Sequence, residues 1–216
     1  MTARVRAVVF DWGGVLQRTV DPAHRVALAA ALGRTRAALE EAVFGSAVWD
    51  AASRGALPAD AAWEAIARDL GWPTAHLDEF VERFFAGDRV DGALVRLIEG
   101  LRAAGVPVGL LSNAPPPRAR GATGAGRWGM EGLFDVQVFS YEVGVLKPDP
   151  AMYARILSAL GVPAPEALFI DDAPENIAGA RRAGMATHLF SGGEALVAAL
   201  CRHGLPVPAD LRGEEA

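Results

Sequence analysis

The fold is decided by a stretch at residues 8–16, which has the sequence VVFDWGGVL. Together with Val5, its apolar and β-branched start is typical of a short, buried parallel strand. The strand is expected to end at Asp11, and the two glycines that follow predict a tight turn. A carboxylate at this position can serve as a nucleophile or as a metal ligand. The alternative is an aspartate that only caps the turn, and this stretch alone leaves both open.

Strands and helices alternate through the second half of the chain. Short apolar runs predict strands at residues 106–111, 136–140, 167–170 and 187–190. Helical spacing of apolar residues predicts helices at residues 92–104, 150–160, 174–183 and 194–202. Such alternation predicts an α/β fold with a parallel sheet and right-handed crossovers, in which ligands bind at the carboxyl ends of the strands.

The first half of the chain has a different pattern, because it contains helical signals only. Apolar residues recur at helical spacing in segments near residues 22–32, 36–44, 59–70 and 76–85. This stretch leaves the sheet just after Asp11, so we expect a separate helical cap over the same edge. The predicted organisation is a core at residues 1–17 and 89–204, a cap at 18–88, and a flexible tail at 205–216.

Composition excludes several classes of protein. The chain has 216 residues, of which 51% are hydrophobic, so it can form a packed core and is not disordered. Its net charge is 21 − 26 = −5, and we expect neither nucleic acid nor a membrane as partner. Cys201 is the single cysteine, which excludes an internal disulfide. The sequence has no run of roughly 18 apolar residues, the length needed to cross a bilayer, and its start reads as a strand and not as a signal peptide. The chain is therefore expected to be soluble and cytoplasmic.

Two further polar groups follow predicted strands. Ser112 and Asn113 end the strand at 106–111 and could hold a phosphate, although a Ser-Asn pair is also a routine loop start. Lys147 lies in the segment GVLKPDP and is the single lysine among 21 basic residues. A codon bias that favours arginine explains the scarcity, and a lysine that survives it is less readily dismissed as a solvated surface residue. A compact ammonium can neutralise both a phosphate and a carboxylate.

A pair of adjacent acids closes the strand at 167–170. Asp171 and Asp172 repel each other and are costly to bury unless hydrogen bonds or a cation offset the charge. Oxygen-only ligands favour Mg²⁺, which keeps waters and substrate oxygens in its coordination shell. Capping of the next helix is the alternative, but it explains one acid and not both. Asn176 lies in the first turn of that helix and could orient either carboxylate.

The cap is expected to select the substrate. Trp12, beside Asp11, and Trp49 and Arg54, within the cap, are candidate substrate contacts, although a large aromatic such as Trp49 more commonly packs in a core. The loop at 114–129 carries a basic cluster that could contact a phosphorylated ligand, although we expect solvated side chains there: Arg118, Arg120 and Arg127.

These groups, in this order, resemble the haloacid dehalogenase superfamily of hydrolases. The match lies in VFDWGGVL around Asp11, LLSN at Ser112 and Asn113, GVLKPDP around Lys147, and FIDDAPENIAGA around Asp171 and Asp172. The resemblance extends over residues from about 4 to 200 and is strongest to the branch with a helical cap and to small sugar-phosphate phosphatases. It implies a Rossmann-like parallel sheet core with helices on both faces and an inserted α-helical cap.

The resemblance also implies a role for each residue. Asp11 would attack phosphorus and form an aspartyl-phosphate, while Lys147 would stabilise the charge on both groups. Ser112 and Asn113 would bind the phosphoryl oxygens. The magnesium ligands would be Asp11, the carbonyl of Gly13, and Asp172 supported by Asp171. Phosphoryl transfer depends mainly on positioning and electrostatic stabilisation, which this set of groups can supply.

One position departs from the family pattern. Most phosphatases of this superfamily carry a second aspartate two positions after the nucleophile, which protonates the leaving group and then activates water. Here that position is Gly13, which can offer a carbonyl oxygen but cannot transfer a proton. General acid–base catalysis is typically worth about 10²–10⁴-fold in rate. The implied enzyme is slower, prefers good leaving groups, or uses another acid.

Three functional hypotheses follow. The first is a Mg²⁺-dependent phosphatase of a small phosphorylated metabolite, with sugar phosphates among the candidates. The second is a non-catalytic phospholigand-binding protein, for which Gly13 is the best support. The third is a 2-haloacid dehalogenase, which needs no metal and against which the Asp171–Asp172 pair argues. The sequence leaves the oligomeric state open.

Overall fold

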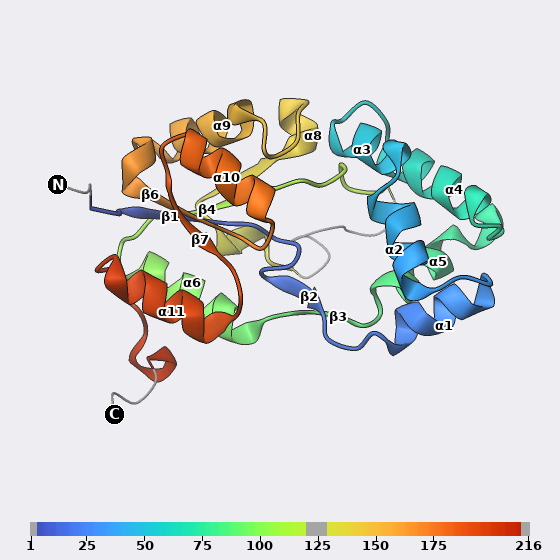
Figure 1. Cartoon of the computed structure of the whole chain (residues 1–216), viewed down its shortest axis with the longest axis horizontal. Helices are drawn as coiled ribbons and strands as arrows, with labels where there is room; N and C mark the ends of the chain where they lie inside the picture. Colours follow the sequence, from blue (N-terminus) through green and yellow to red (C-terminus); the bar gives the residue numbers. More distant parts are fainter. Residues whose placement is uncertain (1–3, 120–128, 213–216) are drawn as a thin grey trace.

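The computed structural model describes residues 4–119 and 129–212 and contains a five-stranded parallel sheet in the order β5-β4-β1-β6-β7 (Figure 1). The strands are β1 (Ala7–Phe10), β4 (Val108–Ser112), β5 (Val136–Phe139), β6 (Ala167–Asp171) and β7 (Ala186–Leu189). The strand β1 is central and pairs with β4 on one side and β6 on the other. The sheet confirms the predicted α/β parallel fold.

Helices cover both faces of the sheet (Figure 1). One face packs against α6 (Gly92–Ala103) and α11 (Gly193–Arg202), and the other against α9 (Pro150–Leu160) and α10 (Pro174–Arg182). Side chains of a strand point alternately to its two faces. Accordingly, Val8 and Phe10 of β1 lie in the first core, and Val9 lies in the second.

The segment between β1 and β4 folds mainly as helices with a hydrophobic core of their own. These helices are α1 (Ala23–Ala31), α2 (Arg36–Phe44), α3 (Ala47–Ser53), α4 (Ala59–Asp69) and α5 (Leu77–Phe85). Helix α3 had no counterpart in the sequence-based prediction. Its seven residues are too few to establish a helical period, although Ser46 caps it by accepting a hydrogen bond from the Trp49 N–H. We call this helical segment the cap.

Two short strands join the cap to the sheet domain, and neither was predicted. Strand β2 (Gln17–Thr19) pairs antiparallel with β3 (Asp88–Val90), with Arg18 opposite Arg89. Each strand has three residues and a largely polar sequence, so neither carries an alternating apolar signal. The expected cap limits, residues 18 and 88, fall within this two-stranded ribbon.

Short helical segments complete the described chain. They are α8 (Ser140–Val143) and the 3₁₀ turns η1 (Thr74–His76), η2 (Glu131–Leu133), η3 (Ala164–Glu166) and η4 (Ala209–Leu211). The expectation of a flexible tail from residue 205 is wrong at its start, because Leu205 and Val207 are buried in the core beside α6 and α11. Pro208 packs so closely on α6 that a Cβ at Gly100 would lie 2.4 Å from its Cγ. Within the described residues, no helix combines the length and apolarity needed to cross a membrane.

Candidate active site

The carboxyl edge of the sheet gathers polar side chains from four separate segments of the chain. Asp11 follows β1, Ser112 ends β4, Asp171 ends β6, and Lys147 lies in the loop between α8 and α9. All four are buried, with Asp11 at 8% exposure and Asp171 at 0%. The parallel topology places these strand ends side by side, as the sequence indicated.

Lys147 is the centre of this group. Its Nζ lies 2.8 Å from Oδ1 of Asp11 and 2.7 Å from Oδ2 of Asp171. Burial by itself lowers the pKa of Lys147, but the two carboxylates outweigh it and raise the pKa above its ordinary value, so the ammonium stays charged. Burial raises the pKa of Asp11 to about 7, against the opposing effect of Lys147. A cation bound beside Asp11 would favour its carboxylate form.

Asp171 is fully engaged in holding this lysine. Asn176 donates from Nδ2 to both of its oxygens, each at 3.1 Å, and the Ala173 N–H donates to Oδ1 at 2.9 Å. Lys147 is therefore fixed by a carboxylate that is itself fixed by the start of α10. The two adjacent acids therefore differ in their surroundings, because Asp171 is buried against Lys147 and Asp172 is exposed.

Asp172 lies against the turn that follows β1. A Cβ at Gly14 would lie 2.0 Å from Oδ2 of Asp172, and Gly14 has a φ of +80°, which favours glycine. One oxygen from each of Asp11, Asp171 and Asp172 can lie within 4.8 Å of the others. Burial raises the pKa of Asp172, and Asp171 adds to the effect. An all-oxygen, mutually repelling set of this kind suits Mg²⁺.

Asn113 has a partner that the sequence did not reveal. Its Nδ2 donates to the carbonyl of Lys147 at 3.1 Å, and its Oδ1 accepts from the Lys147 N–H at 2.8 Å. The side chain was expected to contact the phosphoryl group, but here its amide is engaged with the backbone that carries Lys147. Asn113 thereby positions Lys147, whereas Ser112 lines the neighbouring cavity beside it.

A cavity of about 370 Å³ lies between this edge and the cap. From the sheet domain it is lined by Trp12, Gly13, Gly14, Ser112, Asn113, Ala114, Pro115 and Phe139; from the ribbon and cap by Gln17, Arg18, Thr19, Arg25, Phe44, Trp49, Trp63, Phe85 and Asp88. Trp49 both lines the cavity and packs edge-on against Trp63, with ring centroids 5.2 Å apart. Arg54, the other expected cap contact, is exposed and is not among the lining residues.

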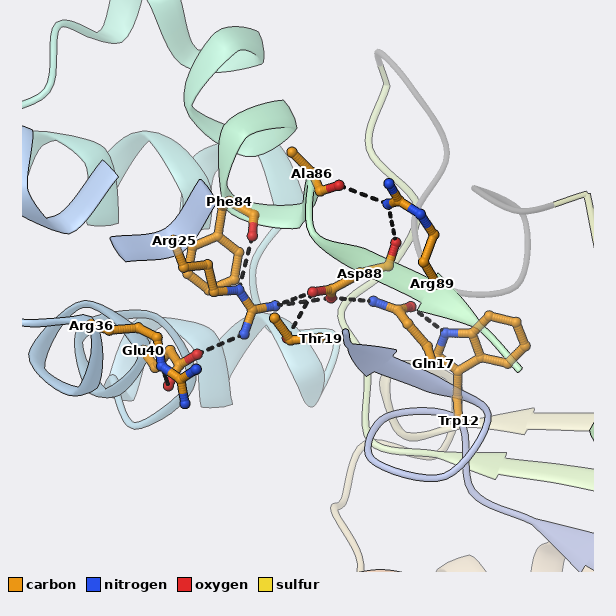
Figure 2. A network of polar contacts seen from close by, with 10 residues as sticks. All are labelled: Trp12, Gln17, Thr19, Arg25, Arg36, Glu40, Phe84, Ala86, Asp88 and Arg89. Atoms are coloured by element: carbon orange, nitrogen blue, oxygen red, sulfur yellow. Dashed lines mark hydrogen bonds and ion pairs between the residues drawn. The ribbon is translucent and has the colours of Figure 1, made fainter. Parts of the chain in front are cut away.

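A polar network connects Trp12, which follows β1, to the cap (Figure 2). The indole Nε1 of Trp12 donates to Gln17 at 2.6 Å, and Gln17 donates to Asp88 at 2.8 Å. Arg25 reaches both oxygens of Asp88 through one nitrogen, at 3.0 and 2.9 Å. Arg25 also donates to Glu40 and to the carbonyl of Phe84, each at 2.9 Å. Sequence reasoning missed Arg25 and Asp88, because nothing in their local patterns marks them as partners.

The loop after β4 is also tied to the cap. The expectation that Arg118 is solvated is wrong, because its side chain is buried against two cap carboxylates. It donates to Asp60 at 2.7 Å and to Asp78 at 2.6 Å. The sequence separation of these partners hid the contact. Arg120 and Arg127 lie outside the described residues.

The sequence is similar to a family of hydrolases and to individual phosphatases. The haloacid dehalogenase-like hydrolase family matches residues 5–184. The chain is 27% identical over 188 residues to a sesquiterpene phosphatase of Aspergillus oryzae, a match that covers 86% of this chain and 89% of that protein. It is 31% identical over 200 residues to a phosphoglycolate phosphatase of Rhodospirillum rubrum, which covers 87% and 80%.

Solved structures share the fold. A HAD-like family hydrolase from Porphyromonas gingivalis has a TM-score of 0.69 at 24% identity, over 93% of this chain and 98% of that chain. A HAD family enzyme from Bacteroides thetaiotaomicron, in complex with magnesium and inorganic phosphate, has a TM-score of 0.66 at 20% identity, over 88% and 96%. An L-2-haloacid dehalogenase has a TM-score of 0.61 at 28% identity, over 86% of each chain.

Proposed function

Since the chain belongs to the haloacid dehalogenase-like hydrolases, we propose that it is a Mg²⁺-dependent phosphatase of a small phosphomonoester, with Asp11 as the nucleophile. The observation that carries this proposal is the buried lysine between Asp11 and Asp171, next to the outward-facing Asp172. A carboxylate that attacks an anionic phosphoryl group needs compensating positive charge at the point of attack. Lys147 supplies it from one side.

The metal site proposed from the sequence fits the residues present. Asp11, Asp172 and the carbonyl of Gly13 would hold Mg²⁺, with Asp171 in support. When bound, the ion would neutralise charge on the phosphoryl oxygens. The B. thetaiotaomicron enzyme of the same fold was crystallised with magnesium and inorganic phosphate, which supports the choice of metal.

The chain's own residues divide the remaining tasks. Asp11 attacks phosphorus, and Lys147 stabilises the charge that Asp11 and the phosphoryl group share. Asn113 and Asp171 hold Lys147 in place through its backbone and its ammonium. Ser112, at the end of β4, would donate to a phosphoryl oxygen in this proposal. Water then releases phosphate from the aspartyl-phosphate and regenerates Asp11.

The cavity supports a small substrate, and two relatives are named as phosphatases of small molecules, a sesquiterpene and phosphoglycolate. Its walls carry aromatic rings, which favour an apolar group over the sugar considered from the sequence. A non-catalytic phospholigand-binding protein is the second candidate, and the residue that favours it is Gly13. The Asp171–Asp172 pair favours the phosphatase and the phospholigand-binding protein over a dehalogenase.

Hydrolysis of acetyl phosphate and p-nitrophenyl phosphate tests the proposal, because neither leaving group needs much protonation. We expect turnover with Mg²⁺, and loss of turnover with EDTA and in Asp11→Asn. Asp11→Asn keeps the size of the side chain and removes the nucleophile, and its circular dichroism spectrum and its Tm without added metal check that it remains folded. Activity toward both compounds no greater than that of Asp11→Asn would refute a phosphatase. Stabilisation by phosphate without turnover would then favour the binding protein.

A further inference from the structure

Aromatic rings surround the cavity on both sides. Phe44, Trp49, Trp63 and Phe85 come from the cap, and Trp12 and Phe139 come from the sheet domain. The cap rings contact one another edge-on, with Phe44 and Trp49 centroids 5.5 Å apart. Rings in such arrangements prefer a further ring in an offset or edge-on position. The walls therefore suit a flat, apolar group better than a polyhydroxylated one.

Apart from Ser112, the polar residues in the same lining are bonded to other partners. Asp88, the one carboxylic acid among the described lining residues, is buried and bonded to Arg25, Gln17 and Thr19. Arg18 pairs with Asp91. No histidine, cysteine, tyrosine or lysine occurs among the described lining residues. The sequence of 120–128, which the structure does not describe, also contains no acid or histidine.

Gly13 has no side chain at the position where a proton-donating side chain could lie. It lines the cavity, and a Cβ built on it would have no atom within 4 Å. Neither the chain at this position nor the described cavity wall therefore supplies an acid for a departing alkoxide. The hydroxyl of an alcohol or sugar has a pKa near that of water, about 16, whereas a phenol has a pKa of about 10. Only the second class departs readily as an anion.

From the aromatic walls and the absence of an available general acid in the described lining, we infer that the substrate is an aryl phosphate, the phosphate monoester of a phenolic hydroxyl. This inference rests on the proposed phosphatase function and names its substrate class. An Asp11 oxygen forms a bond to phosphorus while the bond from phosphorus to the aryl oxygen breaks. The electron pair stays on the aryl oxygen, which leaves as a phenolate and takes a proton from solvent. Water then attacks the aspartyl-phosphate, giving inorganic phosphate and the carboxylate of Asp11.

A matched pair of substrates tests the leaving group separately from the ring. 1-Naphthyl phosphate and 1-naphthylmethyl phosphate present the same ring system, but the first releases a phenol and the second an alcohol. We expect kcat/KM to be at least about 10²-fold higher for the first, the size of a missing general acid. Octyl phosphate and glucose 1-phosphate serve as apolar and polar alkyl comparisons.

Two variants at one position check that the missing proton donor causes this difference. Gly13→Asp adds a carboxylic acid, and Gly13→Asn adds a side chain of the same size that cannot donate a proton in this way. We expect Gly13→Asp to narrow the ratio between the two naphthyl substrates by about tenfold or more. Gly13→Asn should leave that ratio as it is.

The ring requirement is tested at Phe44, which lines the cavity yet is partly exposed. Phe44→Leu should lower kcat/KM for 1-naphthyl phosphate several-fold and affect acetyl phosphate less. Val26→Ala, at an exposed apolar residue of α1, is the control for changes in the cap that do not reach the cavity.

Three outcomes decide the matter. A large naphthyl ratio that Gly13→Asp narrows and Gly13→Asn does not would support the inference. If acetyl phosphate is hydrolysed but octyl phosphate, glucose 1-phosphate or 1-naphthylmethyl phosphate matches 1-naphthyl phosphate, the aryl assignment is overturned and the phosphatase stands. If no compound is turned over above the Asp11→Asn background, both proposals fall.

Discussion

Replacing Arg25 with methionine tests how far the buried network stabilises the cap. Methionine keeps the length of the apolar stem and removes the guanidinium. Arg25 and Asp88 have side chains that are 7% and 4% exposed, so the substitution leaves a buried carboxylate without its main partner. Breaking a buried pair by removing one partner typically costs about 3–5 kcal/mol.

The expected loss lies at the lower end of that range. Asp88 keeps hydrogen bonds from Gln17 and from Thr19, each at 2.8 Å, and these offset part of the uncompensated charge. We therefore expect Arg25→Met to lower the free energy of unfolding by about 3 kcal/mol. In a chain of this length that corresponds to a fall in Tm of about 6–12 °C.

The assay is a double-mutant cycle followed by thermal and urea unfolding. Asp88→Asn removes the charge and keeps one of the two oxygens that accept from Gln17 and Thr19. The double variant should be less destabilised than the sum of the single variants. Residues in direct contact commonly couple by about 0.5–3 kcal/mol. Single-variant effects that add to within about 0.5 kcal/mol would refute the reasoning, because they would mean that the two charges do not depend on each other.

Three other predictions concern the catalytic edge and the sheet. Lys147→Arg should lower kcat at least about 10²-fold, because a planar guanidinium cannot take the place of an ammonium held at 2.8 and 2.7 Å by two carboxylates; wild-type activity would contradict it. Gly14→Ala should displace Asp172 and so weaken Mg²⁺ binding about 10–100-fold, measured by calorimetry. Gly13→Ala is the control and should lose less Mg²⁺ affinity, because its Cβ meets no atom within 4 Å. Burial lowers the pKa of His188 below its usual 6.5, with Arg202 and His203 adding to the effect. Below a pH of about 6.5, the unfolded chain therefore binds more protons than the folded chain, and the free energy of unfolding decreases as the pH falls. His188→Leu should remove this part of the pH dependence of Tm.

The sheet and the meeting of the four polar groups could be predicted because both follow from local signals. Apolar β-branched runs identify strands, and parallel topology brings their carboxyl ends to one edge. Asp11, Ser112, Lys147 and Asp171 each stand at or near such an end, so their proximity needs no knowledge of side-chain geometry. The family assignment, which rested on the segments around these residues, was also confirmed.

Contacts between the cap and the rest of the chain could not be predicted in this way. Arg25 and Asp88 are 63 positions apart, and Arg118 and Asp60 are 58 apart. Each is an ordinary charged residue in its own segment, and only the packing of the cap shows that it is buried and paired. The ribbon of β2 and β3 was missed because strands of three largely polar residues carry no periodic signal.

The point of insertion of the cap would allow the proposed substrate selection to change without disturbing Asp11, the proposed nucleophile. Asp11 is held from the sheet, through its N–H to the carbonyl of Ile170 at 2.9 Å and through Lys147. Its neighbour Trp12 is held from the ribbon, through Gln17, which bonds in turn to Asp88 where the chain returns from the cap. A shift of the cap would therefore act on the Trp12 indole through these hydrogen bonds, whereas Asp11 has contacts of its own to the sheet and to Lys147. Exchange of cap rings should consequently alter which esters bind while the pairing of Asp11 with Lys147 stays intact.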